Sequence, residues 1–196
     1  MSNTGPAGAV AEQCCTRPED CATIIAPLRG LMRELSALIG GLSDAQYCST
    51  APHQRGTIGG HVRHILDHVS TVVRPHEVGG LTYDARERGT DVETSRTVAQ
   101  QTIHALLESL NKLNSRSGGD AFDLAVQLTR DGAGTLVRTT FARELAFVQS
   151  HTVHHNAIIA AIARALGATV PEDFGYAPAT LAHEDRTTCA PSPSSH

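Results

Sequence analysis

Apolar and polar positions repeat with a helical period over four stretches of the chain. In the first, residues 24–45, leucines recur every three or four positions. This spacing puts them on one face of a helix that packs against a core. The other three helices are predicted over 57–78, from 90 to about 115–119, and over 141–166. The pattern therefore predicts an all-α or mainly α protein with four long helices.

Residues that favour helix ends flank three of these stretches. Thr57 precedes the second helix as an N-cap. The segment "TDVE" predicts a capping box of Thr90 and Glu93 at the start of the third. Gly167 follows the fourth helix, where a left-handed residue commonly ends a helix.

A β-hairpin is predicted between the third and fourth helices. Residues 122–141 alternate apolar and polar positions on both sides of the turn "DGAG", a pattern typical of paired strands. The connection "GGLTYDARERGT" between the second and third helices is long enough for a crossover. The expected architecture is thus a four-helix bundle with a long crossover and a hairpin inserted before the last helix.

Composition places one folded domain between two tails. The 196 residues include no Trp and few aromatics, so the core must be built mainly of aliphatic side chains. Both ends of the chain are rich in Pro, Ser, Thr and Gly, as in segments without a packed core. We therefore expect tails over 1–22 and 184–196 and one domain over 23–183.

Charge and hydropathy exclude several classes of protein. The net charge is −4 and the basic residues are scattered, which disfavours nucleic-acid binding. The longest apolar run, 157–163, is too short to span a bilayer. The first residues carry no signal-peptide pattern, so a cytoplasmic location is expected. The five cysteines include no CxxC motif and predict free thiols; Cys48 is interpreted as an ordinary thiol rather than a nucleophile.

Three histidines interrupt the predicted fourth helix. Since each helical residue turns by about 100°, His155 falls near the centre of the apolar face and His151 about 60° to one side. His154 lies roughly 120° away from that centre. A buried imidazole is costly unless its nitrogens have partners. The pattern therefore favours His151 and His155, rather than His154, as metal ligands or hydrogen-bonded core residues.

The predicted second helix carries three further histidines at spacings of three and four. His61, His64 and His68 lie along one flank of its apolar face. The helical angles slightly favour His61 or His68 over His64 as the core-facing histidine, and they do not choose between His61 and His68. Two imidazoles from the fourth helix and one from the second would hold Zn²⁺, Ni²⁺ or Fe²⁺ with open coordination positions. The alternative is a set of core-edge histidines bonded to carboxylates or carbonyls.

The motifs "TIGGHVRHILDH" and "RELAFVQSHTVHHNAII" resemble the DinB/YfiT-like superfamily of metal-binding four-helix proteins. The likeness covers most of residues 24–182. In that family the helix-two histidine follows a Ser/Thr start by seven residues, which implies His64 here. The family HxxxH motif implies His151 and His155 as the other ligands. The chain departs from the Arg-Gly-Gln that follows "HH" in many members.

The resemblance also implies a function. It implies an up-down-down-up bundle, often a homodimer, that binds a divalent metal and a small-molecule substrate. Characterised relatives include transferases and an isomerase that use low-molecular-weight thiols, so a thiol-dependent S-transferase or isomerase is expected. A metal-dependent hydrolase and a non-catalytic metal- or ligand-binding dimer are the alternatives. The extra histidines, His61, His68 and His154, are interpreted as outer hydrogen-bond partners or proton carriers.

Two loops contribute weaker candidates for substrate binding. Tyr83 and Arg86 belong to "YDARER", in which an arginine could bind a carboxylate or phosphate, or simply stabilise a turn or a dimer contact. Tyr176 belongs to "PEDFGYAP", which could cover the mouth of the site or pack against the end of the bundle.

Overall fold

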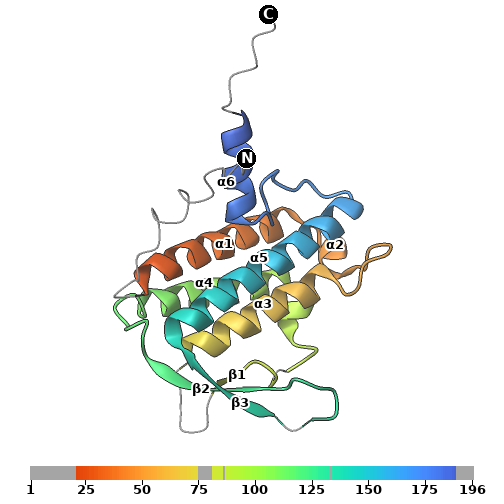
Figure 1. Ribbon diagram of the computed structural model, residues 1–196. Helices are drawn as coiled ribbons and strands as arrows, with labels where there is room; N and C mark the ends of the chain where they lie inside the picture. Colours follow the sequence, from red (N-terminus) through yellow and green to blue (C-terminus); the bar gives the residue numbers. More distant parts are fainter. Residues whose placement is uncertain (1–20, 75–80, 86, 133, 189–196) are drawn as a thin grey trace, which may run out of the picture.

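Four long helices pack around one aliphatic core in the computed structural model, which describes residues 21–74, 81–85, 87–132 and 134–188. They are α1 (Ala22–Gly41), α3 (Ile58–Val73), α4 (Arg96–Asn111) and α5 (Phe141–Ala165). α1 and α3 do not adjoin closely; each packs against both α4 and α5 (Figure 1). The prediction of a mainly helical protein is confirmed.

Side-chain contacts fix the directions of the four helices. Arg96 at the start of α4 donates to the carbonyl of Ile39 at the end of α1, so these two helices are antiparallel. His61 contacts His155, and His64 contacts His151, so α3 and α5 are antiparallel as well. Figure 1 shows α1 and α5 running one way and α3 and α4 the other.

A small sheet lies beside α3 and the start of α5, at the bottom of Figure 1. β2 (Ala121–Val126) and β3 (Thr135–Thr140) form the predicted hairpin and are antiparallel, with Leu124 opposite Val137. The short strand β1 (Leu81–Thr82), which the sequence did not predict, pairs in parallel with β2. It brings the crossover segment, and Tyr83 with it, against the bundle.

Several helix ends agree with the capping residues found in the sequence. The Thr57 side chain accepts a hydrogen bond from the Gly60 N–H at the start of α3. α3 ends at Val73 rather than at 78, because Pro75 disfavours a helical residue before it. Gly167, after α5, has φ 73° and so is in the predicted left-handed conformation.

Other boundaries differ from the prediction. The first predicted helix is divided into α1 and the short α2 (Asp44–Cys48), because Ser43 and Gln46 form a capping box. Thr90 forms no side-chain cap; it precedes a 3-10 turn, η1 (Asp91–Glu93), and the cap of α4 is Ser95. The predicted capping box of Thr90 and Glu93 is therefore wrong.

The carboxylate of Glu93 serves a tertiary contact instead of a cap. It lies 2.7 Å from the Arg63 guanidinium on α3 and accepts a hydrogen bond from the Gly89 N–H. A helix-start pattern in the sequence cannot distinguish these uses, because both need only a carboxylate near a chain reversal.

The ends of the described chain hold more structure than the tails predicted from composition. Cys21 is buried and α1 begins at Ala22. α6 (Pro178–Thr188), near the top of Figure 1, continues into the segment expected as a tail from 184. Residues 1–20 and 189–196 lie outside the described chain. No described helix combines the length and the apolar character needed to cross a membrane.

Candidate metal centre

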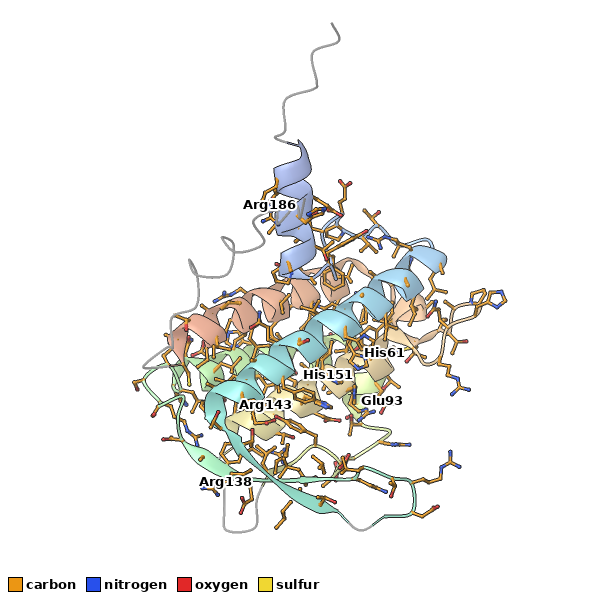
Figure 2. The ribbon with its side chains drawn as sticks, in the orientation of Figure 1. His61, Glu93, Arg138, Arg143, His151 and Arg186 are labelled. Carbon is orange, nitrogen blue, oxygen red and sulfur yellow. The ribbon has the colours of Figure 1, made fainter. Side chains whose placement is uncertain are left out.

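The histidines of α3 and α5 face each other across the antiparallel pair of helices. Figure 2 shows His61 and His151 on the facing sides of these two helices. One nitrogen from each of His64, His68 and His151 lies within 4.8 Å of the other two, a spacing at which one metal ion could bind all three. The Nε2 atoms of His64 and His151 are 2.9 Å apart. Two of the three predicted ligands thus belong to this group, and His68 is the third.

His155, the remaining predicted ligand, lies beside this group. Its ring centroid is 4.5 Å from those of His64 and His151. Its Nδ1 is 3.0 Å from Nδ1 of His61, whose Nε2 is 3.0 Å from the carbonyl oxygen of Arg55. The structure therefore places His155 beside the group of three histidines, where it is hydrogen-bonded to His61.

Backbone carbonyls determine which nitrogens keep a lone pair. The Arg55 carbonyl can only accept, so Nε2 of neutral His61 donates to it and Nδ1 accepts from Nδ1 of His155. Similarly, Nδ1 of His68 donates to the carbonyl of His64. Nε2 therefore carries the lone pair in both His68 and His155, which is the form that a metal ligand requires.

The histidines of the cluster differ in burial. His68 and His155 are buried, His61, His64 and His151 are partly exposed, and His154 is exposed. His154 lies next to His155, with ring centroids 5.1 Å apart. The cluster thus has an inner side within the bundle and an outer side open to solvent.

Aromatic rings hold the inner side in place. Tyr83 stacks on His68 at a centroid distance of 4.9 Å, and His68 stacks on His151 at 4.1 Å. Phe147, one turn before His151 on α5, stacks on His151 at 5.5 Å. These contacts restrict the ring planes of two candidate ligands, as partners of metal ligands commonly do.

Tyr83 is fixed in turn by a buried carboxyl group. Its hydroxyl donates to Glu144, which also accepts from the Thr139 hydroxyl and the Arg143 guanidinium. Burial, reinforced by the charge of Glu144, raises the pKa of Tyr83 well above its usual range, so the hydroxyl remains a donor. Tyr83 was predicted to bind substrate; its hydroxyl is committed to Glu144 and its ring to His68.

The sequence analysis missed Glu144, although a signal was present. A charged residue lies between Phe141 and Leu145, both of which belong to the apolar face of the fourth helix. A carboxyl group on a core face needs partners, and here they come from β3, α5 and the crossover. The sequence analysis also named two weaker candidates for substrate binding. Arg86 lies outside the described residues, and Tyr176, 45% exposed, lines a different pocket between α1, α5 and α6.

Acid should destabilise the metal-free protein through His155. Burial, with smaller effects of His151 and His61, lowers the pKa of His155 from 6.5 to about 3. Between these values the unfolded chain binds a proton that the folded chain does not. The free energy of unfolding should therefore be highest above about pH 6.5 and fall as the pH drops toward 3, by at most about 1.4 kcal/mol per pH unit from this residue.

Urea unfolding at several pH values in the presence of a chelator measures this effect. His155→Gln should flatten the slope between pH 6.5 and 4, whereas His104→Gln, which changes an exposed histidine of α4, should retain it. Equal slopes for both variants and the parent would contradict the assignment.

Comparison with known proteins adds one partial match. No family model matches the chain, and no solved structure matches it. FK506-binding protein 5 of Rhizopus delemar is 35% identical over 106 residues, which is 53% of this chain. The chain spans about a quarter (27%) of that relative's length, so FK506 binding is a property named for the relative and not for this chain.

Proposed function

We propose that this protein is a metal-dependent enzyme of the DinB/YfiT-like type, with a divalent cation held by histidines of α3 and α5. The observation that carries the proposal is the convergence of nitrogens from His64, His68 and His151 within 4.8 Å. The resemblance of the two histidine motifs to that superfamily supports the same site. His155 is the fourth residue that could take part.

The donor set suits a borderline metal ion. Imidazole nitrogens bind Zn²⁺, Ni²⁺ and Fe²⁺, whereas Mg²⁺ and Ca²⁺ prefer oxygen. His68 and His155 each donate Nδ1–H to a neighbour, so in the neutral form the lone pair of each ring lies on Nε2. The residues therefore fit such a cation without a change of tautomer at these two positions.

A bound divalent cation supplies Lewis acidity and lowers the pKa of a thiol or water that it contacts. His64 and His151 are partly exposed, so such a group would approach them from solvent. His61 orients His155 through its contact with Nδ1. His154 is exposed beside His155 and is the residue best placed to carry a proton to or from solvent.

Thiol transfer is the activity that we propose for this site. The thiolate of a low-molecular-weight thiol would form a bond to an electrophilic carbon as the leaving group departs, and the thiol proton would pass to solvent. The Arg55 carbonyl would orient the His61 ring, and His61 would orient the His155 ring throughout the reaction. The hydrogen bond between the two rings uses Nδ1 of His155 and not its Nε2.

An assay of the zinc-loaded protein tests this function. Bacillithiol, mycothiol, glutathione and cysteine are offered separately with monochlorobimane, and conjugate formation is followed by fluorescence. We expect turnover with at least one thiol, its loss in His151→Ala and its retention in His104→Ala, which lies on α4 facing α1. Hydrolysis of an ester without a thiol would favour a hydrolase. Full zinc occupancy with neither reaction would favour a binding protein.

A further inference from the structure

A second pocket lies between the β-hairpin and the first turns of α5. Its volume is about 510 Å³, within the range of small-molecule sites. Leu124, Val126, Val137 and Phe147 provide apolar walls. None of the described residues that line it is a histidine, so this lining is distinct from the candidate metal centre.

Two guanidinium groups lie at the rim of this pocket. Arg138 on β3 and Arg143 on α5 are both lining residues, and their side chains are 66% and 61% exposed. Figure 2 shows both at the junction of the hairpin and α5. Arg138 donates to Asp123 and Arg143 to Glu144, each through one nitrogen. Because a guanidinium carries five N–H donors, each arginine can donate to a further anionic partner.

The buried carboxyl group in the wall does not favour a cationic ligand. One oxygen of Glu144 accepts from Thr139 and Arg143, and the other accepts from Tyr83. Both of its oxygens thus already accept hydrogen bonds from the protein. The available hydrogen-bonding capacity of the pocket is that of donors, at the two arginines.

The balance of charge favours a monoanion. Arg138 is paired with Asp123, and Arg143 with Glu144, so these four groups together carry little net charge. A phosphate dianion would need excess positive charge to offset its desolvation. A carboxylate needs two well-placed N–H donors and offers a planar match to a guanidinium.

We propose that this pocket binds a small carboxylic acid, with its apolar body against Leu124, Val126 and Phe147 and its carboxylate between Arg138 and Arg143. An aromatic ring or a branched aliphatic chain suits the mostly apolar walls. Binding here needs no metal, since every group named belongs to the hairpin or to the start of α5.

The pocket nevertheless adjoins the metal centre through two shared aromatic rings. Tyr83 and Phe147 line the pocket, and the same rings stack on His68 and His151 respectively. The two rings are 5.3 Å apart. An acid in the pocket would therefore contact the residues that hold two candidate metal ligands in orientation.

Titration with benzoate, benzamide and phenyl phosphate tests the proposal. Affinity is measured by calorimetry, and the position of binding by NMR of the methyl groups of Leu124, Val126 and Val137. We expect benzoate to bind and to shift these methyls. Benzamide should bind at least about tenfold more weakly, because it loses one charge-assisted hydrogen bond. Phenyl phosphate should also bind at least about tenfold more weakly, because two arginines already paired with carboxylates do not offset the desolvation of a dianion.

Matched arginine variants localise the carboxylate. Arg138→Gln and Arg143→Gln should each weaken benzoate binding about tenfold or more. Arg130→Gln removes the same charge from the hairpin turn, outside the pocket lining, and should have no effect. Both pocket arginines are exposed, so folding should persist; far-UV circular dichroism checks this.

The outcomes separate this proposal from the metal site. Benzoate binding that is unchanged in chelator, and zinc content that is unchanged in Arg138→Gln, are expected. Equal affinity for benzoate and benzamide, methyl shifts confined to other regions, or equal losses in all three arginine variants would each overturn the acid site. A protein that takes up no zinc when zinc is supplied, but still binds benzoate, would leave the acid site standing while removing the proposed enzyme.

Discussion

Replacing His151 with alanine is expected to lower the affinity for Zn²⁺ by more than about 100-fold, since loss of an outer partner of a ligand alone commonly costs about 10–100-fold. His151 lies at the centre of the cluster: its Nε2 is 2.9 Å from Nε2 of His64, and its ring stacks on His68. Competition with a zinc-binding dye measures the affinity. His64→Ala should cause a loss of the same order.

Two further variants decide which residue is the third ligand. If His64, His68 and His151 hold the ion, His68→Ala should reduce affinity as strongly as His151→Ala and His155→Ala much less. The reverse order would support the set that the family resemblance implies. His154→Ala, which changes an exposed histidine on the same helix, is the control. Equal zinc affinity in His151→Ala and the parent would remove the proposed centre.

Gly59→Ala should destabilise the fold by at least about 3 kcal/mol, at the upper end of the usual cost of overpacking a core. A Cβ at this position of α3 would lie 2.0 Å from the carbonyl oxygen of Glu93 and 2.8 Å from Cε1 of Tyr47. The first of these contacts is with backbone, so η1 would have to move away from α3. Thermal and urea unfolding measure the change.

Gly60→Ala is the matched control for this prediction. A Cβ there would meet Thr57 Oγ1 at 3.4 Å, an ordinary contact, and φ needs no left-handed conformation. Alanine is the better helix former by about 0.8–1 kcal/mol. Gly60→Ala should thus leave stability unchanged or raise it, and similar losses in both variants would contradict the packing argument.

The elements that the sequence predicted well are those specified by neighbouring residues. The hairpin β2–β3 follows from alternating side chains around a Gly-containing turn, and Thr57 and Gly167 mark helix ends through local capping. These signals depend on a few adjacent residues, so they can be recognised without knowledge of the fold.

The elements that were missed depend on distant partners. β1 is a strand because Leu81 and Thr82 pair with β2, about forty residues later in the chain. Glu93, which was predicted to cap a helix, instead forms an ion pair with Arg63 of another helix. Neither choice can be derived from local pattern, because the competing partners are set by packing.

The candidate site divides in the same way. The spacing of the histidines determined, from the sequence alone, that α3 and α5 each carry imidazoles on or beside a core-facing stripe. The placement of these imidazoles follows from the 3.6-residue period, which is a property of a single helix. The identity of the converging nitrogens depends on the antiparallel register of the two helices and on the carbonyls of Arg55 and His64. Only the tertiary structure determined these, because the relative position of two helices is set by contacts between them and by neither helix alone.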